Sequence, residues 1–344
     1  MGYFLGVDGG ATKTKTVLGN EKGEILGIGE GPPSNFQLIG LEGALEAIKM
    51  AVGGVLAESS LSLGQVERTV FGLAGADLPA HFRELEKALS SSFPSLSFRV
   101  VNDTWIALKG GARKGWGVAL VCGTGGNACI CTPQGEWFTV RGMGYEYGLG
   151  AGALYMIRDI LHYAFRSYDG IGPKTKLEQE VLKSLSLPGY DVLADMLFSF
   201  FVSPSFTSSE LRNLLNLVPV LFELASEGDE VCQSILLQQG RVLGEIGGWL
   251  IKRMRLEDED VEVVLVGGVY GGENPLLMDQ LTLSLHQLAP SAKVVFPLFE
   301  PAIGGYLLAL EDKGVYIPAS GISWNLPGET GNSQRWSGGG DANL

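Results

Sequence analysis

Residues 3–16, YFLGVDGGATKTKT, have the composition of a phosphate-binding turn between two strands. An apolar run ends at Asp8, two glycines follow, and threonine then alternates with lysine. We expect Gly9 and Gly10 to adopt positive φ angles, so that several backbone N–H groups point at one anion. The predicted phosphate ligands in this turn are Gly9, Gly10, Thr12, Lys13 and Thr14.

Asp8 has the wrong charge for direct contact with a phosphate, because its carboxylate repels that anion. A divalent cation between the two groups removes the repulsion, so we interpret Asp8 as a magnesium ligand that acts through water. The alternative is a glycine-rich hairpin in which Asp8 only caps the turn.

A second glycine turn, GTGG at residues 123–126, follows another apolar run. We expect it to hold the same triphosphate from the opposite side, through the predicted ligands Gly123, Thr124, Gly125 and Gly126. Further along the chain, Gly267 and Gly268 end a third apolar run. Because they lack side chains, an adenine ring could lie against their backbone, although a tight turn before Pro275 explains them almost as well.

Asp103 is the candidate general base. It comes just after residues 98–101, which we predict to be a strand, and we place it at the end of that strand, pointing toward the two turns. There its carboxylate would accept the proton of an attacking hydroxyl group, while the rest of phosphoryl transfer depends on positioning and charge neutralisation. The alternative is an N-cap for the helix that follows, a position that favours aspartate.

The composition of the whole chain favours a small-molecule ligand. The formal net charge of -13 argues against nucleic acid or an anionic membrane as a partner, because either requires a basic patch. The four cysteines, Cys122, Cys129, Cys131 and Cys232, lack the spacing of a metal site, so we interpret them as packing residues. No apolar run approaches about 18 residues and no leader pattern is present, which predicts a cytoplasmic, soluble protein.

The apolar periodicity indicates one plan that is used twice. Residues 3–101 predict the order β-β-β-α-β-α-β, and a helix at 104–110 leads into the second half. Residues 117–165 repeat the order β-β-β-α, and residues 229–310 close the second half as α-β-α-β-α. A chain of 344 residues suits this division into two domains.

We therefore predict an α/β protein with two domains. The N-terminal domain comprises residues 1–112 and 301–317, and the C-terminal domain comprises residues 113–300. Within the second domain, residues 168–227 form a helical insertion, because proline punctuates a helical pattern there. Residues 318–344 are rich in Gly, Ser and Asn and lack periodicity, which predicts a flexible tail that is either mobile or loosely docked.

Eight motifs carry a resemblance to a known family. They are DGGATKT (8–14), GPPSN (31–35), GLAGAD (72–77), VNDTWIAL (101–108), CGTGGN (122–127), RGMGYEYG (141–148), VGGV (266–269) and EPAIGGYLLAL (300–310). In this order they resemble the BadF/BadG/BcrA/BcrD family of the actin, Hsp70 and sugar-kinase superfamily, over about residues 2–312. The resemblance implies two ribonuclease H-like (actin-like ATPase) domains.

The best understood members of that family are N-acetylglucosamine kinases. The resemblance therefore implies an enzyme that uses ATP and Mg²⁺ to phosphorylate a hydroxyl group of a hexose or amino sugar, with N-acetylglucosamine as the default. Ser34 and Asn35 match the family's sugar-contacting loop, with an Asx turn as the structural alternative. The predicted sugar contacts are Ser34, Asn35, Gly75, Asp77, Asn102, Asp103, Thr124 and Glu146.

One segment departs from the kinase pattern. The kinases have an acidic stretch resembling GDEGSG, and one of its acids helps to hold the sugar, whereas residues 148–152 here are GLGAG. Glu146 lies nearby and is the candidate substitute. The departure leaves the identity of the sugar open, and also whether the chain has kept its activity.

Two other function classes remain open at this point. Some members of the family are ATP-hydrolysing activators of a reductase, with a cysteine-held iron–sulfur cluster shared between subunits, and the cysteine spacing here does not match that use. A sensor that binds nucleotide and sugar without turnover is the other class, because fold alone does not exclude it. A homodimer is left open.

Overall fold

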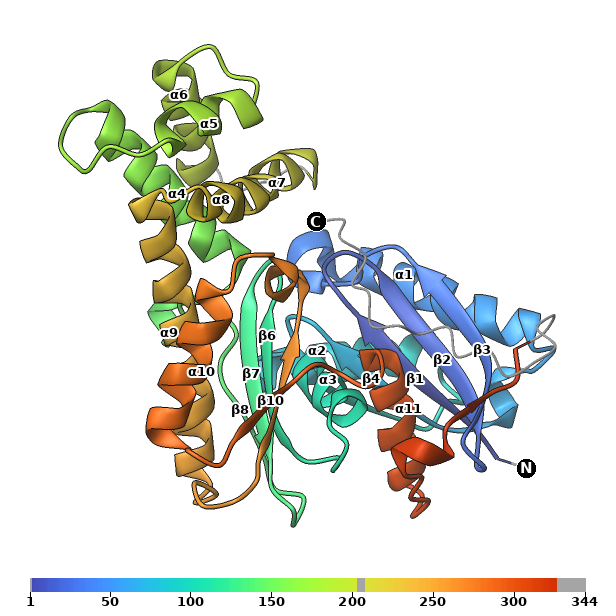
Figure 1. The fold of residues 1–344 in the computed structure, drawn as a ribbon. Coiled ribbons are helices and arrows are strands. Elements are labelled where there is room, and N and C mark those ends of the chain that lie inside the picture. Colours follow the sequence, from blue (N-terminus) through green and yellow to red (C-terminus); the bar gives the residue numbers. More distant parts are fainter. Residues whose placement is uncertain (1, 203–207, 327–344) are drawn as a thin grey trace.

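The computed structural model describes residues 2–202 and 208–326, which form two mixed β-sheets lying side by side with two helices between them (Figure 1). The first sheet has the order β11-β3-β2-β1-β4-β5 and the second has the order β10-β9-β6-β7-β8. The strands of the first sheet are β1 (Tyr3–Gly9), β2 (Thr14–Asn20), β3 (Glu24–Gly31), β4 (Val66–Leu73), β5 (Phe98–Asn102) and β11 (Ser323–Trp324). Those of the second are β6 (Gly117–Cys122), β7 (Gly126–Cys131), β8 (Trp137–Thr139), β9 (Glu262–Val266) and β10 (Lys293–Val295).

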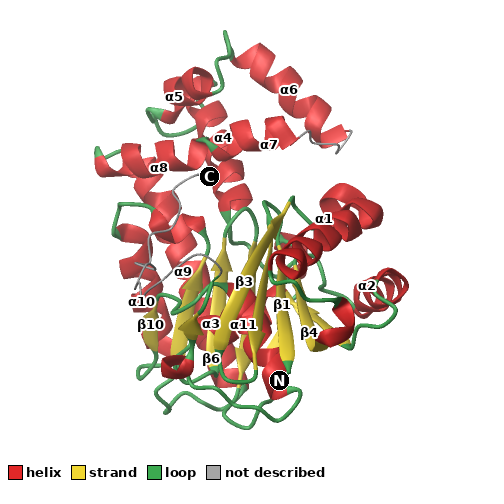
Figure 2. Ribbon diagram, turned by 90° about the vertical axis from the view of Figure 1, so that its right-hand side faces the viewer, coloured by secondary structure: helices red, strands yellow, loops and turns green. Residues whose placement is uncertain are grey.

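The first domain buries both faces of its sheet. Its strands β1, β2 and β3 are antiparallel, and β4 and β5 run parallel to β1. The connecting helices α1 (Phe36–Glu58) and α2 (Pro79–Ser92) cover the outer face (Figure 2). Successive side chains of a strand point to opposite faces, so Leu5 packs under these helices while its neighbour Phe4 packs on the inner face. Burial on both sides explains why β1 is an almost continuous apolar run.

Helices α3 (Asp103–Gly111) and α11 (Pro301–Glu311) lie between the two sheets (Figure 1). They approach each other closely at Gly304, where a Cβ atom would lie 1.9 Å from the carbonyl oxygen of Ile106. On the other side of α3, the indole of Trp105 stacks on that of Trp137 in β8, with ring centroids 4.3 Å apart. The start of α3 is therefore fixed by contacts with both domains.

The second domain repeats the arrangement and adds a helical extension. Its outer face is covered by α9 (Glu230–Arg253) and α10 (Leu276–Leu288), with α4 (Ala153–Tyr168) entering from the second glycine turn. The predicted insertion contains α5 (Leu177–Ser184), α6 (Tyr190–Val202), α7 (Ser208–Leu215) and α8 (Leu217–Ser226), which project beyond the sheet (Figures 1 and 2). Short 3-10 helices are η1 (Leu63–Gln65), η2 (Tyr145–Tyr147), η3 (Gly268–Gly271) and η4 (Ala319–Gly321).

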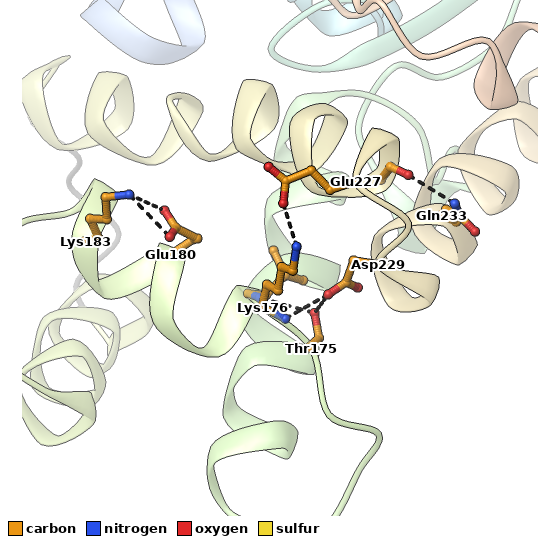
Figure 3. Close-up of polar contacts among 9 residues, drawn as sticks. Thr175, Lys176, Glu180, Lys183, Glu227, Asp229 and Gln233 are labelled. Atoms are coloured by element: carbon orange, nitrogen blue, oxygen red, sulfur yellow. Dashed lines mark hydrogen bonds and ion pairs between the residues drawn. The ribbon is translucent and has the colours of Figure 1, made fainter.

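Asp229 ties the insertion to the domain that carries it. Its carboxylate caps α9 by accepting from the backbone N–H groups of Val231 and Cys232, both at 3.1 Å. It also accepts from the Thr175 hydroxyl and the Lys176 amide, both at 2.8 Å (Figure 3). These contacts hold the pKa of Asp229 below its ordinary value despite partial burial. The network is structural and joins the insertion to α9.

The predicted two-domain α/β plan is confirmed, and one boundary is wrong. Residues 319–326 are not a flexible tail, because β11 adds a parallel strand to the edge of β3. Ser323 N–H donates to the carbonyl of Gly23 at 3.0 Å, and Trp324 packs into the core beside α11. A strand of two residues is too short to show periodicity in a sequence. The rest of the predicted tail, 327–344, lies outside the described residues.

Across residues 2–202 and 208–326, no helix has the length and apolar character needed to span a membrane.

Candidate active site

The first glycine turn is a tight hairpin between β1 and β2. Gly9 pairs with Thr14, and the Gly10 N–H donates to the carbonyl of Lys13 at 3.0 Å. The predicted positive φ angles are wrong, because Gly9 is still part of an extended strand and Gly10 also lies outside that region. Gly9 is needed for space, since a Cβ atom there would lie 2.7 Å from Oγ of Ser34. Thr12 and Lys13 are exposed at the tip of the turn.

Thr14 and Ser34 lie beneath this turn. The Thr14 hydroxyl donates to the carbonyl of Pro32 at 2.6 Å and lies 2.8 Å from Oγ of Ser34. Thr14 is fully buried and Ser34 is 2% exposed, so both hydroxyl groups hold the following loop against the hairpin. The two side chains fix the turn in place whatever ligand it binds.

Asn35 follows and is partly exposed. It is the N-cap of α1, where its side chain accepts from the backbone N–H of Gln37 at 3.0 Å. The Gln37 amide in turn donates to the carbonyl of Gly75 at 3.0 Å. The Asx arrangement is therefore present, and it places Asn35 beside Gly75 at the end of the first sheet.

The second glycine turn is fixed by the start of α4. The carbonyls of Gly123 and Thr124 accept from the N–H groups of Ala153 and Leu154, at 2.9 and 3.0 Å. A Cβ atom at Gly123 or Gly125 would meet no protein atom within 4 Å. The turn is thus held from behind and open on the side of these two glycines, which suits an anion bound by backbone amides.

Gly267 brings the third glycine segment against this turn. It directly follows β9 with a φ of 120°, and a Cβ atom there would lie 2.3 Å from the carbonyl oxygen of Cys122. Gly267 and Gly268 are both exposed. The glycines leave an open backbone surface next to Gly123.

Asp103 is the first residue of α3, so its predicted place at the end of a strand is wrong by one residue. The N-cap is Asn102, whose side-chain oxygen accepts from the Thr104 N–H at 3.1 Å. Oδ1 of Asp103 is buried and accepts no hydrogen bond within the protein. Burial, with a smaller contribution from the negative charge of Asp77, raises the pKa of Asp103 from 3.8 to about 7.

A polar network connects Asp103 to the second domain through its neighbour Asn102. Asn102 Nδ2 donates to Oδ1 of Asp77 at 3.2 Å, and Asn127 Nδ2 lies 3.3 Å from both Asp77 Oδ1 and Asn102 Oδ1. The backbone amide of Gly142 also donates to Asp77. Asn127 and Gly142 belong to the second domain, so Asp77 lies where the two domains meet. Asn127 was not predicted, although it ends the CGTGGN motif.

Asp8 lies in a second group of charges. Burial, Asp103 and Glu300, in that order, raise the pKa of Asp8 from 3.8 to about 7, and Lys15 and Lys13 act against them. Lys15 forms an ion pair with Glu300, the N-cap of α11, and lies 3.8 Å from Glu30. The pairing of Lys15 with Glu300 joins residues 285 positions apart, so no local pattern predicts it.

Residues 148–152, which stand where the kinases have their acidic stretch, add no carboxylate to the group around Asp8. Leu149 and Ala151 are buried, and Glu146 is exposed on η2. The remaining predicted sugar contacts, Asn35, Gly75 and Asp77, lie on two neighbouring loops of the first domain.

Two mixed sheets with α3 and α11 between them, and a glycine turn after the first strand of each, define the two-domain fold of the actin-like sugar kinases. Residues 5–309 match the BadF/BadG/BcrA/BcrD ATPase family, and the chain belongs to it.

Two relatives are similar over most of their length. The N-acetyl-D-glucosamine kinase of Dictyostelium discoideum is 29% identical over 330 residues, covering 90% of this chain and 98% of that protein. The N-acetylmuramic acid/N-acetylglucosamine kinase of Clostridium acetobutylicum is 26% identical over 321 residues, with 90% and 98% covered. A crystal structure from Chromobacterium violaceum, provisionally described as an N-acetylglucosamine kinase, shares the fold with a TM-score of 0.69, 23% identity and coverage of 90% and 99%.

Proposed function

We propose that this protein is an ATP-dependent kinase of an amino sugar, with N-acetylglucosamine as the first acceptor to test. Asp103 carries the proposal. Its Oδ1 is buried and unpaired, and a pKa of about 7 leaves a large share of the carboxyl ionised at neutral pH. A general base works best when its pKa lies near the working pH. A hydroxyl group placed against Oδ1 would supply the missing hydrogen bond and then its proton.

The residues of the chain divide the reaction between them. Asp103 takes the proton of the acceptor hydroxyl as its oxygen bonds to the γ-phosphorus of ATP, and the bond from that phosphorus to the bridging oxygen breaks to release ADP. We assign the phosphates to the turns at 9–14 and 123–126, because Gly123 and Gly125 leave space beside backbone amides. We assign the adenosine to the exposed glycines Gly267 and Gly268.

Asp8 fits a magnesium ion bound through water. The pKa of this carboxyl is raised because it is buried near the like charges of Asp103 and Glu300, and a cation offsets both effects. No group of three or more His, Cys, Asp or Glu side chains in the described part of the chain is arranged to hold a metal ion. Mg²⁺ suits such a place, because it commonly keeps several waters and uses substrate phosphates with one or two carboxylates. When bound, it neutralises phosphate charge.

The acceptor is assigned to the loops around Asp103. Asn35, Gly75 and Asp77 come from the first domain, and Thr124 comes from the second, so a sugar bound among them would contact both. Ser34 and Asn102 support this surface from below, since both are buried. The acceptor is taken to be an amino sugar because both relatives named above are kinases of N-acetylated amino sugars.

The cysteines favour the kinase over the reductase activator. Cys122, Cys129, Cys131 and Cys232 are all buried, and burial raises the pKa of Cys122, Cys129 and Cys131 to about 12, 12 and 11. An iron–sulfur cluster shared between subunits requires thiolates at the surface.

An ADP-release assay tests the proposal. Wild-type protein with ATP and Mg²⁺ is screened against N-acetylglucosamine, glucosamine, N-acetylmuramic acid and glucose. We expect sugar-dependent ADP release with at least one amino sugar, and a loss of at least about 10²-fold in Asp103→Asn. The matched control is Asp191→Asn, an exposed aspartate at the start of α6. ADP release that no sugar stimulates would contradict the kinase assignment.

A further inference from the structure

The loop that contains η2 presents two tyrosines and a carboxylate to solvent beside the candidate active site. Tyr145 is 69% exposed and Tyr147 is 52% exposed, and Glu146 between them is exposed as well. Gly144 and Gly148 flank the three residues with φ angles of 107° and 90°, a region that favours glycine.

Backbone hydrogen bonds close this loop on itself. The N–H groups of Tyr147 and Leu149 both donate to the carbonyl of Gly144 at 3.1 Å, and the Gly148 N–H donates to the carbonyl of Tyr145 at 2.9 Å. The ring of Tyr145 lies 6.5 Å from that of Tyr155, centroid to centroid, and the Tyr155 hydroxyl contacts the Tyr145 amide. The three outward side chains are therefore carried by a pre-formed loop.

The loop stands next to the acceptor residues. The Gly142 amide donates to the carboxylate of Asp77, which Asn102 connects to Asp103. Three residues of chain span at most about 11 Å, so Tyr145 lies within that distance of Gly142. Because both tyrosines are exposed, their rings lie on the solvent side of Asp77 and Asn102.

Exposed aromatic rings next to a carboxylate are the chemistry that binds a pyranose. One face of a sugar ring presents C–H groups, which a tyrosine ring covers, and the hydroxyl groups at its rim donate to a carboxylate. Glu146 is the only carboxylate between Gly142 and Gly152. The segment 148–152 has none, so in this region recognition depends on apolar contact and Glu146.

We propose that Tyr145, Glu146 and Tyr147 form an outer acceptor subsite that binds a second sugar ring linked to the ring being phosphorylated. The acceptor class would then be a glycosidically extended amino sugar, such as a β-1,4-linked dimer. This inference rests on the proposed kinase function. The subsite lies on the solvent side, so it accepts the part of the acceptor that projects away from Asp103.

The test compares the N-acetylglucosamine monomer with its β-1,4-linked dimer. The ratio of kcat/KM for the dimer to kcat/KM for the monomer is measured in wild type, Tyr147→Ala and Tyr145→Ala. We expect this ratio to fall by about 10-fold in each variant, the effect of losing one aromatic contact of about 1.4 kcal/mol. The matched control is Tyr316→Ala, whose side chain is 75% exposed and lies beyond α11; its ratio should equal that of wild type.

The outcomes separate the subsite from the kinase function. A dimer that is neither phosphorylated nor a competitor of the monomer overturns the subsite, and so does an unchanged ratio in both variants. If no sugar is phosphorylated, the kinase function fails and calorimetry decides the subsite alone. Binding of the dimer to wild type that is no tighter than binding of the monomer, or is unaffected by Tyr147→Ala, then overturns it.

Discussion

Replacing Asp103 by asparagine should lower activity and raise stability at the same time. Asparagine has nearly the same shape as aspartate but carries no charge. In the wild type, the ionised carboxylate is held with Oδ1 buried and unpaired near Asp77, so its ionisation destabilises the folded state. If Asp103 served only as a helix cap, the same replacement would leave stability nearly unchanged at every pH, because asparagine caps a helix about as well as aspartate.

The magnitude follows from the pKa. The pKa of this carboxyl rises from 3.8 to about 7 on folding. Each pKa unit corresponds to about 1.36 kcal/mol, so above pH 7 its ionisation lowers the free energy of unfolding by at most about 4 kcal/mol. Asp103 is partly exposed, and solvent screening therefore reduces this destabilisation. A negative charge at the start of a helix also interacts favourably with the helix dipole, which restores about 0.3–1 kcal/mol of stability. We therefore expect Asp103→Asn to be about 1–3 kcal/mol more stable than wild type at pH 8.

The sign of the pH dependence can be stated in advance. The unfolded carboxyl releases its proton near pH 3.8 and the folded one near pH 7, so the folded wild type loses stability as the pH rises through this window. The asparagine variant has no such loss. The difference in unfolding free energy between variant and wild type should be near zero at pH 4, grow up to pH 7 and stay constant above it.

The assay is urea unfolding at a series of pH values from 4 to 8, together with ADP release. Asp229→Asn is the matched control, because hydrogen bonds lower the pKa of Asp229 in the folded protein, so loss of its charge should destabilise the protein above pH 4. An Asp103→Asn protein that is no more stable than wild type at pH 8, with no dependence of the difference on pH, would refute the reasoning and make Asp103 a structural residue.

Three further predictions concern the glycine turn, the polar network and β11. Gly125→Val should leave the fold intact, because a Cβ atom there meets no protein atom within 4 Å. It should weaken ATP binding by at least about 10-fold, because the new side chain fills the space proposed for the phosphates. Unchanged ATP affinity in calorimetry would contradict that role. Asn127→Ala removes the bonds to Asp77 and Asn102 and should lower kcat by about 10-fold with little change in the KM for ATP, whereas a change in KM alone would count against positioning. Trp324→Ala should lower the free energy of unfolding in urea by about 1–3 kcal/mol, because the partly buried indole packs against the core that contains α11. A decrease below about 0.5 kcal/mol would mean that β11 contributes little to the stability of the domain.

The sequence was sufficient for the fold and for the type of chemistry. Apolar runs that end in glycine turns predicted β1 and β6, because strands buried on both faces are apolar throughout. Their order along the chain then predicted the two halves. The sequence did not predict the φ angles of Gly9 and Gly10 correctly. Glycine occurs both where a turn needs positive φ and where a neighbour such as Ser34 leaves no space for a Cβ atom.

The finer arrangement of the site depends on tertiary contacts. Asn102 and Asp103 are both good caps, so the sequence did not show which of them caps α3 and which is its first residue. The pairing of Lys15 with Glu300 and the contact of Asn127 with Asp77 join distant segments. Local patterns carry no information about such contacts until the sheets are assembled.

Three aspartates from different elements meet at the domain boundary, and the surroundings of each negative charge differ. Asp77, on the loop after β4, receives hydrogen bonds from Asn102, Asn127 and the Gly142 amide, which offset part of the effect of burial that raises its pKa. Asp8 has like charges around it and Lys15 is already paired with Glu300, which is why we propose a cation beside Asp8. Asp103 is left with a buried, unpaired oxygen. Of the three, we propose only Asp103 as the general base, because its unpaired Oδ1 is the place where a sugar hydroxyl would donate its proton during transfer.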